Sequence, residues 1–157
     1  MFIIQGLISG VIATIIFDIF QLSLNYAYGV DKPRWDLVGR YFLGYKKGIY
    51  TRITIADDEQ EENELIWGYV IHYLIGIIYG IFYISLNLLM FNYPSILLAY
   101  FIGFISVLGA WCYLMPFAFN LGFFASKNEN KFKIMSQNLI AHFVFGTGLF
   151  IGLYTVY

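Results

Sequence analysis

The sequence predicts an all-α membrane protein in which four transmembrane helices form a bundle, with a polar cytoplasmic loop between the first two helices. Three observations predict this fold class. Hydrophobic residues make up 60% of the 157 residues and aromatic residues 21%, whereas charged residues make up only 12%. The hydrophobic residues fall in four long runs, and the charged residues lie almost entirely between those runs. A soluble domain of this size has too little interior for so much apolar surface, so a lipid environment is expected.

The four runs are expected to be helical spans within a single domain that covers the whole chain. Their approximate bounds are 2–28, 65–91, 95–124 and 134–157. A helix crosses the roughly 30 Å of hydrocarbon with about 20 apolar residues, and each run meets that length. The first run lacks the basic start and the cleavage site of a signal peptide, so it is expected to be a retained helix. Asn92-Tyr93-Pro94 predicts a tight turn that makes the second and third helices antiparallel neighbours.

The distribution of cations predicts the orientation. All nine Lys and Arg residues fall in the loop 29–64 or in the short loop 126–133, at positions 32, 34, 40, 46, 47, 52, 127, 131 and 133. Short loops rich in Lys and Arg stay in the cytoplasm, so both loops are expected inside and both termini outside. Within the first loop, residues 34–41 read as a short amphipathic helix at the cytoplasmic interface. Trp35 and Arg40 are expected there, either anchored to headgroups or binding a ligand.

The sequence also indicates an internal duplication into two parallel helical-hairpin repeats. The pattern Gly68-x3-His72-x3-Gly76 in the second span is echoed by Asn138-x3-His142-x3-Gly146 in the fourth. Glycines recur 19 residues apart in the first and third hydrophobic runs, at positions 10 and 29 and at positions 103 and 122. Repeats in membrane proteins often frame a site at their interface. Chance recurrence in a chain rich in Gly and Phe is the alternative. Small residues spaced by four also predict helix packing seams.

Three ionisable residues inside the spans, Asp18, His72 and His142, form the candidate site. An ionisable side chain within hydrocarbon costs about 2.5 to 3.5 kcal/mol on insertion scales, so such residues are expected to find partners. Counted from the cytoplasmic ends of their helices, all three reach a depth of roughly 10 to 14 Å. They are therefore expected to converge in one intramembrane polar cluster, together with three neutral polar residues, Gln21, Asn25 and Asn138.

Three roles remain open for this cluster. The first is a hydrogen-bond network that locks the helices together, and the second is a proton-coupled or ion-coupled role, because histidine titrates near physiological pH. The third is ligation of haem b by two histidines, or of a metal ion by two histidines and a carboxylate. No cofactor is predicted from a motif, and neither HExxH nor GxSxG nor a phosphate-binding glycine loop is present, so no catalytic residue is expected.

Pro116 lies inside the third span and is expected to kink it, because proline lacks the backbone N–H and clashes with the preceding turn. The kink either shapes the bundle or opens a cavity. The formal net charge of −1 gives no argument for nucleic acid as a partner. The expected partners are the lipid bilayer and either a second copy of the chain or a larger membrane complex.

The chain resembles the uncharacterised bacterial membrane proteins known as domain of unknown function 2938. The residues that carry the resemblance run the whole length: Asp18, Leu37-Val38-Gly39-Arg40, Gly48, Ile55-Ala56, Trp67, His72-Tyr73-Leu74-Ile75-Gly76, Pro116, Gly122, Ala125-Ser126, His142, Phe145-Gly146 and Gly148-Leu149. The chain departs from the family pattern before Pro116, where Met115 stands in place of a glutamine. The resemblance implies a small multi-pass protein of the bacterial inner membrane, and it supplies no activity.

Three function classes follow. The leading hypothesis is translocation of a proton, an ion or a small solute through the Asp18, His72 and His142 cluster. The second is an accessory or binding subunit that docks onto a membrane complex through its glycine seams. The third is a redox protein that binds haem or a metal. An enzyme is the less favoured reading.

Overall fold

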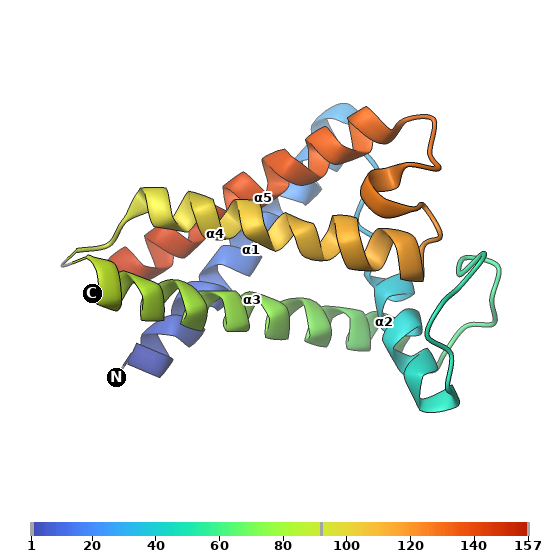
Figure 1. The fold of residues 1–157 in the computed structure, drawn as a ribbon, viewed down its shortest axis with the longest axis horizontal. Coiled ribbons are helices and arrows are strands. Elements are labelled where there is room, and N and C mark those ends of the chain that lie inside the picture. Colours follow the sequence, from blue (N-terminus) through green and yellow to red (C-terminus); the bar gives the residue numbers. More distant parts are fainter. Residues whose placement is uncertain (1, 92, 157) are drawn as a thin grey trace. The chain divides into compact units, whose positions relative to one another are not determined.

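The computed structural model describes residues 2–91 and 93–156. All regular structure among these residues is helical. In chain order the elements are α1 (Phe2–Tyr28), α2 (Trp35–Gly44), the 3₁₀ turn η1 (Tyr45–Lys47), α3 (Glu64–Met90), α4 (Ile96–Gly109), the π-helix η2 (Ala110–Ala118), the 3₁₀ turn η3 (Phe123–Ala125) and α5 (Lys131–Tyr154) (Figure 1).

Four helical segments are long and apolar enough to cross a membrane, which confirms the predicted fold class at that level. They are Phe2–Tyr28, Glu64–Met90, Ile96–Ala118 and Lys131–Tyr154. The third segment ends at Ala118, six residues before the predicted boundary at 124, because Asn120, Gly122 and Phe124 have positive φ angles that break the helix. The fourth begins at Lys131 instead of 134. Of the predicted turn Asn92-Tyr93-Pro94, Asn92 lies outside the described residues.

The chain divides into two compact units. The first comprises Met1–Pro33, Tyr73–Ser106 and Leu139–Tyr157, and the second comprises Arg34–His72 and Val107–Asn138. The first unit therefore holds α1 with parts of α3, α4 and α5. The second holds α2, the long loop that follows it and the first turns of α3, together with the end of α4, the π-helix, the segment that follows it and the first turns of α5.

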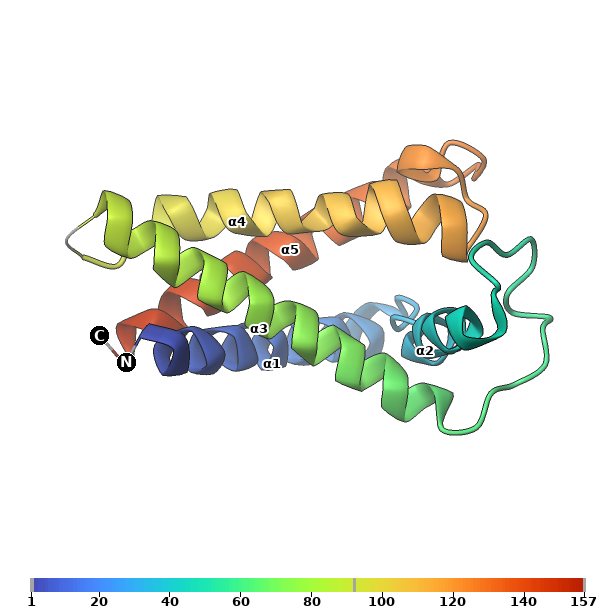
Figure 2. The ribbon, with the colours of Figure 1, turned by 60° about the horizontal axis from the view of Figure 1, so that its bottom comes forward.

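In the first unit, small residues bring helix backbones together. A Cβ atom added at Gly10 would overlap the backbone of Gly76 on α3, and one added at Gly148 of α5 would come within 2.6 Å of the Cα atom of Ala13. At the ends of these helices, the side-chain amide of Gln5 donates to the carbonyl oxygen of Val156 at 2.8 Å, so the start of α1 lies beside the end of α5 (Figure 2). The predicted packing seams thus hold α1 against both α3 and α5.

In the second unit, α2 confirms the short helix expected in the polar loop and extends it to Gly44. A Cβ atom at Gly39 of α2 would overlap the carbonyl oxygen of Glu64, and one at Gly68 of α3 would overlap that of Trp35. The buried side chains of the unit gather around α2 and the π-helix: Leu37, Tyr41, Ile55 and Ala118. Glycines therefore set the close crossing of α2 on the start of α3.

Pro116 lies inside the π-helix, which gives the expected irregularity a specific form. In an α-helix the proline ring would clash with the carbonyl group four residues earlier. The backbone N–H of Phe119 instead bonds the carbonyl oxygen of Leu114 at 3.0 Å, a spacing of five residues. The wider turn takes up the proline, and the chain then leaves the helix through residues with positive φ.

Candidate functional site

Asp18 lies half-buried on α1 and accepts a hydrogen bond from the Tyr73 hydroxyl of α3, with 3.1 Å between that oxygen and Oδ2. The helix seam explains this contact. Thr14, one turn before Asp18, sits where a Cβ atom at Gly76 would be, and Gly76 lies three residues after Tyr73. Because a glycine lets the two backbones approach, the next turn of α1 carries Asp18 to the hydroxyl of Tyr73.

His142 lies half-buried on α5, and its Nδ1 atom is 2.7 Å from the Oγ atom of Ser106 on α4. A second glycine crossing accounts for the contact, because a Cβ atom at Gly103 would overlap the carbonyl oxygen of His142. Phe17 of α1 meets the imidazole edge to face, with 5.6 Å between the ring centroids. The histidine is thus held by groups from two other helices.

One stretch of α1 therefore carries Asp18 and contacts His142, two of the three predicted ionisable residues. Phe17 and Asp18 are consecutive, and Phe17 contacts His142 while Asp18 bonds Tyr73. All four residues belong to the first unit. The sequence did not mark Tyr73 or Ser106 as candidate site residues. Tyr73 appeared only in the stretch that carries the family resemblance, directly after His72, and Ser106 stands three residues after Gly103.

His72 belongs to the second unit, where its ring stacks on the indole of Trp35, with centroids 3.8 Å apart and planes at 21°. The contact follows from the close crossing of Gly68 against the backbone of Trp35. Trp35, which the sequence placed at a headgroup interface, thus has a histidine as its neighbour. Convergence of His72 with Asp18 and His142 stays a prediction.

The three neutral members of the predicted cluster have different surroundings. Gln21 is half-buried one turn after Asp18, and Asn138 is half-buried one turn before His142. Asn25 lies at the end of α1. Its side-chain amide donates to the carbonyl oxygen of Val30 at 2.8 Å, and its main-chain carbonyl oxygen accepts from the N–H of Gly29 at 3.0 Å. Its side chain therefore terminates a helix.

Arg40 is the most fully engaged charged residue described. Its side chain is 2% exposed, and its Nε and Nη2 atoms each bond a carboxylate oxygen of Glu64 at 2.7 Å. Its Nη1 atom donates to the carbonyl oxygens of Ile55 and Asp58, both at 2.9 Å. The hydrogen bond with Glu64 raises the pKa of the Arg40 guanidinium. Arg40 thus ties Ile55, Asp58 and Glu64, which follow α2 in the chain, to α2.

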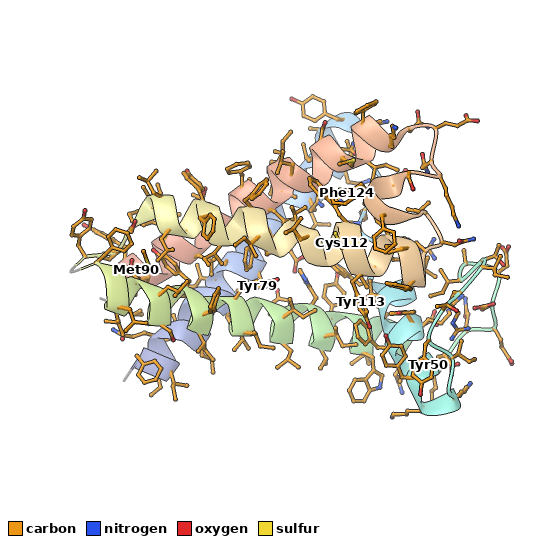
Figure 3. All side chains as sticks on the ribbon, in the orientation of Figure 1. Tyr50, Tyr79, Met90, Cys112, Tyr113 and Phe124 are labelled. Carbon is orange, nitrogen blue, oxygen red and sulfur yellow. The ribbon has the colours of Figure 1, made fainter. Side chains whose placement is uncertain are left out.

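A cluster of three tyrosine hydroxyls lies beside this network. The Tyr45 hydroxyl bonds that of Tyr41 at 3.0 Å and also contacts that of Tyr113, which projects from the π-helix (Figure 3). Tyr41 in turn donates to the carbonyl oxygen of Tyr50 at 2.9 Å. Burial raises the pKa of the Tyr41 phenol, so this hydroxyl stays neutral to a higher pH than an exposed tyrosine.

Within the part of the chain that the structure describes, no group of three or more His, Cys, Asp or Glu side chains is placed to hold a metal ion.

A family model described as Protein of unknown function (DUF2938) matches residues 7–156, nearly the whole chain. This finding confirms the resemblance drawn from the sequence. No curated protein and no solved structure matches the chain.

Proposed function

Since the chain belongs to this family of proteins of unknown function, we propose its role from its own residues: it moves protons, or small ions or solutes coupled to them, through an intramembrane site of Asp18, His72 and His142. One observation carries the proposal. Asp18 and His142 are each hydrogen-bonded to a hydroxyl group, and both adjoin one stretch of α1, since Asp18 projects from it and its neighbour Phe17 packs against His142. Intramembrane ionisable residues commonly mark proton relays and ion pathways.

The chemistry suits proton transfer. Asp18 and His142 can each hold and release a proton, and the Tyr73 and Ser106 hydroxyls give both a hydrogen-bond partner within apolar helices. His72 is the third proposed carrier, and its position directly before Tyr73 on α3 supports its inclusion. The proposed path runs among side chains of α1, α3 and α5 within a four-helix bundle.

The internal duplication is part of the proposal, and two glycine crossings support it. In the first hairpin Gly10 meets Gly76, four residues after His72, and in the second Gly103 meets Gly146, four residues after His142. Each crossing places a histidine one turn from a glycine contact. Two parallel hairpins with equivalent histidines would frame a shared site between them.

We also propose that the protein lies in the bacterial inner membrane with both termini outside. The support is that the nine Lys and Arg residues all lie in 32–52 and 127–133. A reporter that is active only in the cytoplasm should work when inserted near Asp58 or Asn128 and fail at the C-terminus. The opposite pattern would reverse the orientation.

The glycine seams bear on the accessory-subunit alternative. Gly6, Gly10, Gly76, Gly148 and Gly152 each face another helix of the same unit at a distance that a Cβ atom would make too short. These seams are used within the chain, so docking onto a larger complex would need a different surface. An absorption spectrum of the purified protein separates the redox alternative, because a Soret band would indicate haem.

The test of transport is a proton-flux assay in vesicles that contain the purified protein and a pH-sensitive dye. Asp18→Asn and His142→Gln should each remove most of the flux, because neither replacement carries a titrating group. Asp31→Asn is the matched control, since Asp31 is exposed in the loop after α1 and undergoes the same change of charge. Wild-type protein without flux, or Asp18→Asn with wild-type flux, would overturn the proposal.

A further inference from the structure

The geometry around Ser106 points to a positioning role for this residue: it fixes the neutral imidazole of His142 as the tautomer that carries its proton on Nδ1. The nitrogen that takes up and gives back a proton is then Nε2. The tautomer follows from hydrogen bonding alone, whereas the use of Nε2 in proton movement rests on the proposed function.

The argument begins with the number of protons on a serine hydroxyl. The Oγ atom of Ser106 lies 2.7 Å from the carbonyl oxygen of Gly103 and 2.7 Å from Nδ1 of His142. A hydroxyl has one proton to donate, and a carbonyl oxygen can only accept. Both contacts are hydrogen bonds at the same time only if Ser106 donates to Gly103 and accepts from an N–H at Nδ1. The reverse arrangement leaves one of them without a proton.

Burial gives this choice a free-energy cost. Ser106 is 6% exposed, so water has little access to either acceptor. A buried polar group whose hydrogen bond is not made costs about 1 to 3 kcal/mol. The tautomer that satisfies both contacts is therefore preferred over the tautomer that satisfies one.

Helix packing holds the two groups in register. Gly103 lies one turn before Ser106. A Cβ atom added at Gly103 would overlap the carbonyl oxygen of His142 and would lie 3.2 Å from the Cα atom of Gly146. On the other side of the imidazole, the buried ring of Phe17 packs edge to face. The imidazole is thus confined between α1 and α4 with Nδ1 directed at Ser106.

The position equivalent to Ser106 differs between the two hairpins. Ser106 follows Gly103 by three residues, and the residue that follows Gly10 by three is Ala13. Ala13 has no hydroxyl and is fully buried against Gly148. The first hairpin therefore carries no hydroxyl at the position equivalent to Ser106.

The experiment is nitrogen NMR of ¹⁵N-histidine protein in lipid, which reports protonation at each ring nitrogen. The chain has two histidines, so His72→Gln leaves His142 as the single signal. At a pH where this ring is neutral, the signal should show a protonated Nδ1. Adding Ser106→Ala should shift the tautomer ratio toward Nε2–H by roughly two- to tenfold, the range that one net hydrogen bond supports.

Two further variants complete the test. Ser106→Thr retains the hydroxyl and should restore the Nδ1–H form. Ser85→Ala is the matched control, because Ser85 donates to the carbonyl oxygen of Ile81 at 2.8 Å within its own helix, as Ser106 does within α4; it should leave the ratio unchanged. A dominant Nε2–H form in the His72→Gln protein, or an unchanged ratio in Ser106→Ala, would overturn the inference. Since the NMR signal needs no proton flux, absent flux with an Nδ1–H tautomer would refute only the proposed function.

Discussion

Replacing Arg40 by methionine is expected to destabilise the protein strongly, because it leaves the Glu64 carboxylate without its main partner. The Arg40 and Glu64 side chains are only 2% and 12% exposed, and two hydrogen bonds of 2.7 Å join them. Methionine fills similar space and cannot donate. The same change releases the carbonyl oxygens of Ile55 and Asp58, so the loop loses its attachment to α2 as well.

The size of the effect follows from burial. Removing one partner of a buried ion pair costs about 3 to 5 kcal/mol, because the other charge stays desolvated. An exposed pair contributes about 0 to 1 kcal/mol. The chain has such a pair in Lys47 and Glu61, whose charged atoms are 2.6 Å apart while the Lys47 side chain is 59% exposed. Distance alone does not separate the two pairs, so burial decides which one matters.

The assay is the free energy of unfolding in detergent micelles, measured for Arg40→Met, Glu64→Met and the double variant. Arg40→Met should lose about 3 to 5 kcal/mol, and the double variant should lose less than the sum of the single changes, because it leaves no unpaired charge. Lys47→Met should lose less than about 1 kcal/mol. An Arg40→Met protein as stable as Lys47→Met would refute the assignment of Arg40 as the buried anchor of the loop.

Three other changes have defined outcomes. Gly39→Ala should prevent the close crossing of α2 on α3, because its Cβ atom would overlap the Glu64 carbonyl oxygen. Gly109→Ala should be tolerated, because its Cβ atom meets no described atom within 4 Å. Protease resistance of the loop between α2 and α3 reports the difference. Burial raises the pKa of Tyr41 above the unfolded value of about 10, so its contribution to the free energy of unfolding is complete below about pH 10 and is lost as the pH rises further. Thermal unfolding measured against pH should show the protein losing stability above about pH 10, and the Tyr41→Phe protein should lose less. Asp18→Asn should lower the unfolding midpoint less than Asp18→Leu, since the amide can still accept from Tyr73; equal losses would contradict a hydrogen-bonded role.

The hydrophobic pattern was sufficient to predict the helical class and the number of candidate spans, because length and polarity decide those features locally. It overestimated the third span, since Phe119, Leu121 and Phe123 are apolar residues outside the helix. Composition does not distinguish an apolar helix from an apolar loop. Pro116 marked the irregularity, but a change of backbone register to a π-helix depends on neighbouring turns and is not encoded in one residue.

The candidate site was predictable in its charged members only. Asp18 and His142 stand out because ionisable residues are rare in such runs, whereas one tyrosine among 14 and one serine among seven do not. Their roles arise from helix crossings between segments distant in sequence, as the contact between Ser106 and His142 shows. The Arg40 ion pair was hidden for the same reason, because its partner Glu64 follows 24 residues later in the chain.

The glycine seams connect packing to chemistry through α1. On one face of α1 the Thr14 contact with Gly76 leads to the bond between Asp18 and Tyr73; on another the Ala13 contact with Gly148 leads to the contact between Phe17 and His142. Because 13 and 17, like 14 and 18, are one helical turn apart, each seam determines the position of the α1 side chain on the turn that follows. Asp18 and the Phe17 ring that packs on His142 are therefore positioned by separate seams on the same helix, so a shift of α1 toward either neighbour would alter the bond between Asp18 and Tyr73 relative to the contact between Phe17 and His142.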